Sequence, residues 1–72
     1  MRHLHIVRSA HDHLAMDVAR RQVAGGDEVR LVLTGAAVDA EVPEGLESIP
    51  MPTLQYDELV DLLAWCERVV SW

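Results

Sequence analysis

The sequence predicts a single small α/β domain, with a mainly parallel sheet of three or four strands and two packed helices. Three observations support this prediction. A strand-like segment, a helical segment and a second strand-like segment follow one another within about 30 residues, the length of a βαβ unit. A second helical pattern, strongly periodic, occupies the C-terminal part. The chain has 72 residues, of which 50% are hydrophobic, and this is enough for one folded core.

The N-terminal half contains the first two elements. A strand is predicted over His3–Arg8, a short segment rich in apolar residues. The pattern Ser9-x-x-Asp12 is typical of a helix start, because such side chains accept hydrogen bonds from free backbone N–H groups. A helix is therefore predicted over Asp12–Ala24. Its apolar face consists of Leu14, Ala15, Val18, Ala19 and Val23. The small alanines would let it lie close to a sheet.

Two further strands are expected after this helix. The pair Gly25-Gly26 should end the helix, since glycine adopts the left-handed conformation at low cost. The segment Glu28–Thr34 is nearly continuous in apolar residues and predicts a strand covered on both faces. Residues 35–45 predict a loop with at most one helical turn. A short third strand is expected from Leu46 and should end near Pro50.

The last helix is predicted over Asp57–Val69, because apolar residues recur there at three- and four-residue steps. The recurring residues are Leu59, Leu62, Leu63, Cys66, Val69 and Val70. Cys66 lies in the middle of this stripe and is expected to pack against the core or a subunit contact. A nucleophilic cysteine would need exposure and a nearby cation or helix N-terminus. Packing is therefore the favoured interpretation of Cys66.

Charge and length limit the function classes. The net charge is −6 and the chain contains no lysine, which argues against direct binding to nucleic acid or to anionic lipid. The N-terminal segment lacks the apolar run of a secretory signal. No stretch is long enough to span a membrane, so a cytoplasmic protein is expected. A single cysteine excludes an internal disulfide, and a small monomeric core would be marginal.

All four histidines lie in the N-terminal segment: His3, His5, His11 and His13. Imidazoles bind zinc, copper or nickel, and His11 and His13 follow the end of a strand, where open α/β sheets bind ligands. The two pairs fall at opposite ends of one strand and cannot easily converge on one ion. We therefore expect no metal site and regard these histidines as polar strand-end and loop residues. The alternative is a stand-alone homo-oligomeric protein that binds a small molecule or a metal at the His11 and His13 end of the sheet.

Motifs typical of catalysis are absent from the sequence. There is no P-loop, no dinucleotide-binding glycine pattern, no nucleophile elbow and no pair of cysteines at C-x-x-C spacing. Asp57, Glu58 and Asp61 form a carboxylate cluster, which on a helix is usually the solvated face. No catalytic residue and no cofactor are expected, and a non-catalytic role is favoured.

The C-terminal sequence YDELVDLLAWCERVVSW resembles the ending of the DsrH/TusB family of sulfur-relay subunits. The matching residues are Tyr56, Asp57, Val60, Asp61, Leu62, Val69, Ser71 and Trp72. The opening sequence HLHIVRSAHDH and the later DEVRLVLTGAAV also resemble the family's βαβ unit. The chain departs from the family in its short middle segment. It also lacks the first-helix cysteine that some members carry, and Cys66 is not at an equivalent position.

This resemblance implies a DsrE-like fold over residues 1–72 and a life within an oligomer. In the family, DsrE/TusD-type, DsrF/TusC-type and DsrH/TusB-type subunits form a hetero-hexamer that passes persulfide sulfur between cysteines, toward tRNA 2-thiouridine or in sulfur oxidation. The expected partners are the related subunits or further copies of this chain. The predicted interface residues are Trp65, Val69, Val70 and Trp72. Trp72 is expected to anchor a partner because it lies too near the chain end for a good core residue.

Overall fold

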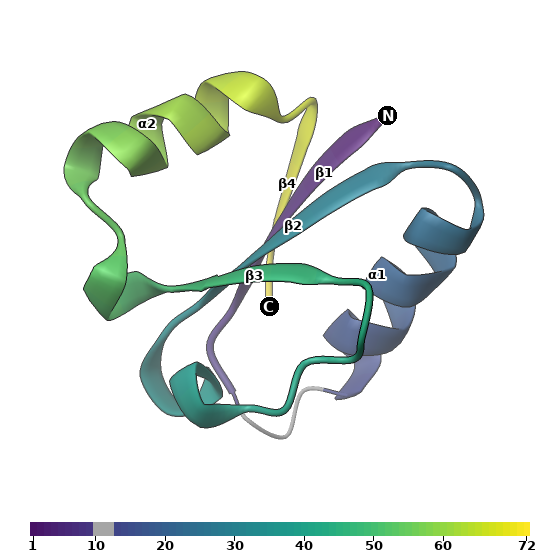
Figure 1. Ribbon diagram of the computed structural model, residues 1–72, viewed down its shortest axis with the longest axis horizontal. Coiled ribbons are helices and arrows are strands. Elements are labelled where there is room, and N and C mark those ends of the chain that lie inside the picture. The colour runs from purple at the N-terminus through teal and green to yellow at the C-terminus, as the bar shows by residue number, and fades with distance from the viewer. Residues whose placement is uncertain (10–12) are drawn as a thin grey trace.

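In the computed structural model, residues 1–9 and 13–72 are described, and they form a sheet of four parallel strands with one α-helix on each face (Figure 1). The elements in chain order are β1 (Arg2–Val7), α1 (His13–Ala24), β2 (Glu28–Leu33), the 3-10 helix η1 (Gly35–Asp39), β3 (Glu47–Pro50), the 3-10 helix η2 (Met51–Thr53), α2 (Tyr56–Trp65) and β4 (Arg68–Ser71). The predicted class of a small α/β domain with a parallel sheet and two helices is confirmed.

The strand order across the sheet is β3-β2-β1-β4. The two central strands therefore come from the βαβ unit, and β3 and β4 form the two edges. The C-terminal strand β4 lies beside the N-terminal strand β1, with Leu4 opposite Val69 and Ile6 opposite Ser71. This pairing places the first and the last strand of the chain side by side, with the N- and C-termini at opposite ends of the parallel pair (Figure 1).

Helix α1 covers one face of the sheet. Its Ala15 and Ala19 are fully buried, so the expected close approach of the two alanines to the sheet is confirmed. The residues of this core are Val7, Ala15, Ala19, Val29, Leu31, Leu33 and Ala37. The helix ends at a glycine turn, in which Gly26 has φ of 95°, a conformation that residues with a Cβ rarely adopt.

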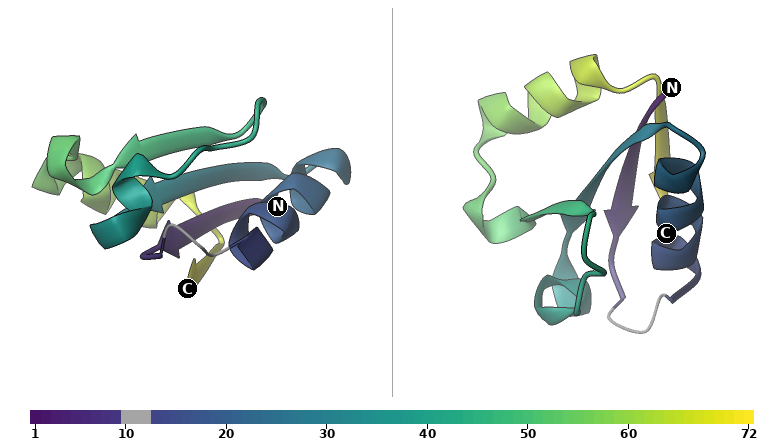
Figure 2. Two further views of the ribbon diagram at one scale, coloured as in Figure 1. Left: turned by 90° about the horizontal axis from the view of Figure 1, so that it is seen from below. Right: turned by 45° about the vertical axis from the view of Figure 1, so that its right-hand side comes forward.

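Helix α2 covers part of the opposite face (Figure 2). Its Leu62 packs with Leu4 of β1 and Val32 of β2 in a second, smaller core. Half-buried apolar residues at its margin are Ile6, Ile49, Met51, Leu54 and Cys66. The α2 side is therefore the less well covered side of the sheet.

The predicted helix over Asp57–Val69 is wrong in its C-terminal part. The helix ends at Trp65, Cys66 has an extended backbone with φ of −81° and ψ of 151°, and Arg68–Ser71 form β4. The Val69-Val70 pair is β-branched, which favours a strand. The apolar spacing typical of a helix continues through these valines. Pairing of β4 with the otherwise free edge of β1 favours the strand more strongly than this spacing favours a helix.

The other boundaries differ by one or two residues. The strands predicted over His3–Arg8 and Glu28–Thr34 are found at Arg2–Val7 and Glu28–Leu33. Within residues 35–45, predicted as a loop with at most one helical turn, Gly35–Asp39 form the 3-10 helix η1, which is longer than one turn. The short third strand is confirmed as β3. The predicted start of the first helix at Asp12 lies outside the described residues. None of the helices in residues 1–9 and 13–72 has both the length and the apolar character needed to cross a membrane.

Candidate functional site

The four predicted interface residues do not form one continuous surface. Trp65 ends α2 and is half-buried. Val69 lies on the α2 face of the sheet, because it is opposite Leu4. Val70 is opposite His5 and so lies on the α1 face. Val69 and Val70 are both exposed, and whether they contact a partner stays a prediction.

Trp65 is held by cations of its own chain. The guanidinium carbon of Arg30 lies 4.4 Å from the centroid of the Trp65 ring, and that of Arg2 lies 5.9 Å away. Both distances fit cation–π contacts. Arg30 also pairs with Glu47 of β3, with 3.4 Å between Nε and Oε2. The indole therefore lies at the end of α2, beside the N-terminal parts of the two central strands, β1 and β2.

Trp72 packs against its own core. Its indole N–H donates a hydrogen bond of 2.9 Å to Nδ1 of His5, and its backbone N–H donates to the oxygen of Ile6. Arg8 donates from Nε to the carbonyl oxygen of Trp72. The side chain also contacts the apolar core beneath α1. The half-buried indole thus packs against the core without being one of its buried residues, and whether Trp72 also anchors a partner stays a prediction.

These bonds fix the protonation of His5. An indole N–H is only a donor, so Nδ1 of His5 must accept and Nε2 must carry the hydrogen. That hydrogen faces Oε1 of Gln22 in α1, at 2.7 Å. Both ring nitrogens are thus satisfied in the neutral form of a fully buried side chain. Through these two hydrogen bonds, His5 of β1 is connected to Gln22 of α1 and to Trp72, the residue that follows β4.

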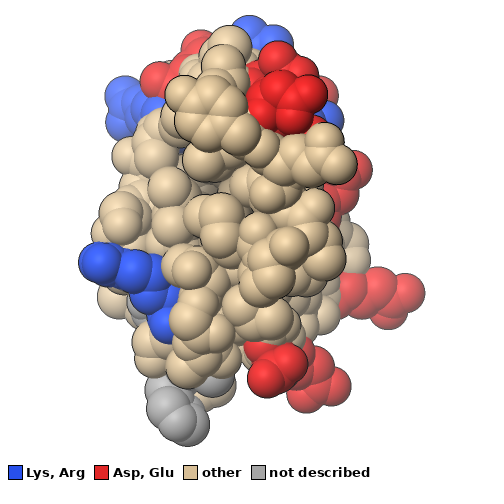
Figure 3. Space-filling model, turned by 90° about the vertical axis from the view of Figure 1, so that its left-hand side faces the viewer, with Lys and Arg blue, Asp and Glu red and all other residues tan. Residues whose placement is uncertain are grey.

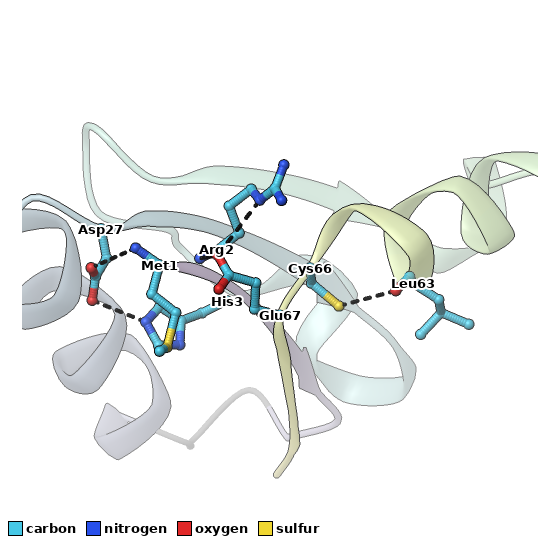
Figure 4. A network of polar contacts seen from close by, with 7 residues as sticks. All are labelled: Met1, Arg2, His3, Asp27, Leu63, Cys66 and Glu67. Carbon is cyan, nitrogen blue, oxygen red and sulfur yellow. Dashed lines mark hydrogen bonds and ion pairs between the residues drawn. The ribbon is translucent and has the colours of Figure 1, made fainter.

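His3 is buried next to it on the same face. Its Nε2 lies 3.0 Å from Oδ2 of Asp27, whose Oδ1 lies 3.1 Å from the amino group of Met1 (Figure 4). The hydrogen bond from His3, followed by the contact with the amino group, lowers the pKa of Asp27 below its ordinary value of 3.8. The interpretation of His3 and His5 as polar strand-end residues is wrong, since both lie beneath α1.

Cys66 is not in the middle of a helical stripe, because it follows the last residue of α2. Its side chain is half-buried at the edge of the smaller core. Sγ lies 3.4 Å from the carbonyl oxygen of Leu63 (Figure 4), which accepts the weak S–H hydrogen bond. The carboxylate of the neighbouring Glu67 accepts a hydrogen bond from the backbone N–H of Arg2 and forms an ion pair with its guanidinium group. These contacts fit a packing cysteine.

A group of apolar side chains on α2 is left uncovered. Tyr56, Val60 and Leu63 lie four and three residues apart and are 83%, 45% and 46% exposed. Residues at these spacings share one face of a helix. Val69 of β4, on the same side of the sheet, is 47% exposed. We call these four residues the α2 surface.

This side of the molecule carries little charge. Seen face-on in Figure 3, the left-hand side of Figure 1 has charged side chains only toward its margins. The acidic residues Asp57, Glu58 and Asp61 lie on other positions of α2 and are exposed. Sequence reasoning missed Tyr56 and Val60 and placed Leu63 on the packed face. The spacing of 56, 60 and 63 is the signal that could have found the α2 surface.

A separate cavity lies between the start of α1 and the connection that leads to β3. Its volume is about 600 Å³, and it is lined by His13, Met16 and residues 40–44. Glu41 and Glu44 bring two carboxylates to it. His11, the other half of the predicted pair, lies outside the described residues. In the described ranges, no group of three or more histidine, cysteine or carboxylate side chains is placed to hold a metal ion.

Comparison of the chain with protein-family models, with curated proteins and with solved structures finds no match.

Proposed function

We propose that this protein is a non-catalytic docking subunit of a sulfur-relay complex of the DsrE/DsrF/DsrH type, and that its domain is a reduced form of the DsrE-like fold. The observation that carries the proposal is the α2 surface. Tyr56, Val60 and Leu63 remain exposed on one face of α2 and Val69 on the same side of the sheet, with only a small core beneath the helix. Such a surface is typical of a protein-interaction site.

The residues that resemble the DsrH/TusB ending fall into two groups. Leu62 and Trp72 have structural roles, because they complete the two cores of this chain. Tyr56, Val60 and Val69 are exposed and stabilise little within the monomer. Contact with a partner subunit would explain why apolar residues occupy these three positions.

The environment of Cys66 supports a non-catalytic role. Transfer of a persulfide sulfur needs an accessible thiolate. The Cys66 thiol is half-buried and donates a weak hydrogen bond to the carbonyl oxygen of Leu63, so its contacts lie within this chain. The sulfur-carrying cysteine would therefore belong to a DsrE/TusD-type partner, and this chain would help position it.

Co-expression with DsrE-type and DsrF-type subunits encoded in the same genome tests the proposal. The expected result is a complex that contains all three chains after affinity purification through the DsrE-type subunit. In a persulfide-transfer assay with a sulfur donor, the label should reach the DsrE-type cysteine in complexes that carry Cys66→Ala. Recovery of this protein without the other two chains, or transfer that requires Cys66, would contradict the proposal.

The cavity at His13 favours a second candidate function, a stand-alone small-molecule-binding protein, whereas a metal ion there would need donors beyond His13, Glu41 and Glu44, which are not placed to hold an ion together. The cavity lies where the helix after β1 begins, and one imidazole and two carboxylates line it. Elemental analysis of untagged protein and thermal shift with zinc, copper or nickel test for such an ion. One tightly held equivalent that is lost in His13→Ala would favour a binding role over the docking role.

A further inference from the structure

We infer that two copies of this chain associate through the free edge of β4, in an antiparallel pairing around a two-fold axis at Val70. This inference concerns self-association and does not rest on the proposed sulfur-relay function. It starts from the backbone of β4. The strand has β1 on one side and no strand on the other, within the described residues.

The register shows which backbone groups of β4 are unpaired. Leu4 is opposite Val69 and Ile6 is opposite Ser71, and the N–H of Trp72 donates to the oxygen of Ile6 at 2.9 Å. In this parallel pattern, alternate residues of β4 bond to β1. The N–H and C=O groups of Val69 and Ser71 therefore point to the free edge.

This edge has less protection than the opposite edge. Natural edge strands are shielded by charged side chains, proline or a covering element. Both edge strands begin at an exposed charged residue, Glu47 in β3 and Arg68 in β4, but only β3 also ends at a proline, Pro50. In contrast, β4 presents exposed valines at 69 and 70, one on each face of the sheet. Edge pairing is therefore expected at β4 and not at β3.

A two-fold axis at Val70 matches the unpaired groups of one copy with those of the other. Val69 of one copy lies opposite Ser71 of the second copy, and Ser71 of the first lies opposite Val69 of the second. Each of these two residue pairs can form two N–H···O bonds between the copies. Arg68 and Trp72 share the α1 face with Val70, since strand residues alternate. Arg68 of one copy then lies opposite Trp72 of the other, where a cation–π contact can form. An axis at Val69 would instead place Ser71 of one copy opposite Glu67 of the other. The N–H of Glu67 is already bonded to the oxygen of Arg2, so this pair could not exchange two bonds.

The expected dimer is weak. A four-residue strand pair falls short of the roughly 1,000 Å² that a stable interface buries. The net charge of −6 on each copy opposes association. We therefore expect dissociation in the micromolar to millimolar range, so that protein concentration controls the population.

Sedimentation velocity and amide exchange by NMR across a concentration series test this dimer. The average mass should rise from that of a monomer toward that of a dimer as the protein concentration is raised to about 1 mM. The amides of Val69 and Ser71 should gain protection with concentration, whereas the amide of Val70 should be protected throughout. A mass that stays monomeric over this range, or Val69 and Ser71 amides that exchange rapidly in the dimer, would overturn the inference.

Variants distinguish association through the edge of β4 from association through another surface of the molecule. Val69→Lys should reduce dimerisation at least tenfold, and Val60→Lys, a change at an equally exposed position of α2, should not. Val69→Pro removes an N–H that makes no bond to β1, so it should abolish the dimer with an unchanged circular dichroism spectrum. Equal loss in Val69→Lys and Val60→Lys, or a dimer that survives Val69→Pro, would contradict the pairing.

Discussion

The indole N–H of Trp72 donates a 2.9 Å hydrogen bond to Nδ1 of the fully buried His5, across 67 positions of sequence. This bond joins the end of the chain to the central strand and to the core beneath α1. It gives Trp72 a structural role within the monomer, in addition to any contact with a partner.

Trp72→Phe should lower the free energy of unfolding by about 1–3 kcal/mol, because it leaves a buried acceptor on His5 without a donor. Urea denaturation measures the change. Tyr56→Leu, at a position 83% exposed, is the control and should change stability by less than about 0.5 kcal/mol. Equal effects of the two substitutions would show that the His5 bond contributes nothing. Nitrogen NMR of His5 should detect hydrogen on Nε2 alone.

The pH dependence of stability should contain a contribution from Asp27. The hydrogen bond from His3 and the amino group of Met1 lower its pKa in the folded state below the 3.8 of the unfolded chain. This contribution is therefore complete above pH 3.8 and is lost as the pH falls through the lower folded-state pKa.

Asp27→Asn should flatten the stability profile in this acidic window, as measured by urea midpoints from pH 2 to pH 6. Glu44→Gln, which changes an exposed carboxylate in the connection before β3, is the matched control. A profile for Asp27→Asn that follows the wild-type curve through the whole window would refute the assignment.

Arg30→Ala should destabilise the domain by about 0.5–1 kcal/mol, through loss of the cation–π contact with Trp65. The tryptophan emission, to which Trp65 and Trp72 both contribute, should shift to longer wavelength as the Trp65 ring becomes more exposed. Arg20→Ala, an exposed position on α1, should affect neither quantity. An unchanged emission spectrum in Arg30→Ala would argue that the ring is held by other contacts.

Cys66→Ala should cost on the order of 1 kcal/mol of stability, since the half-buried thiol packs at the edge of the smaller core. Its labelling by a thiol reagent should be slower in the folded protein than in urea. Labelling at the same rate in both states would indicate a freely accessible and reactive thiol.

The βαβ half of the fold could be predicted because local signals agree there. Apolar runs mark both strands, and the glycine turn at Gly26 marks the end of α1. The C-terminal part could not be predicted in the same way. The spacing of Val69 and Val70 continues the helical pattern of α2, and only the distant free edge of β1 favours a strand there.

The site was predicted less well than the fold for a related reason. The sequence identifies apolar positions on α2, but not which of them the sheet covers. Leu62 is buried and Leu63, one residue later, is exposed. The roles of His5 and Trp72 depend on a contact between the two ends of the chain, for which local pattern holds no signal.

The most direct test of the docking role is the mass of the complex formed by this protein with DsrE-type and DsrF-type subunits, measured by light scattering after size exclusion. Wild-type protein should co-elute with both subunits. Leu63→Glu, which places a charge in the α2 surface, should elute without them and keep a native circular dichroism spectrum. Asp57→Lys, on a neighbouring exposed position, should still bind. Wild-type protein that elutes apart from the other subunits, or a Leu63→Glu variant that binds them as well as wild type does, would contradict the account.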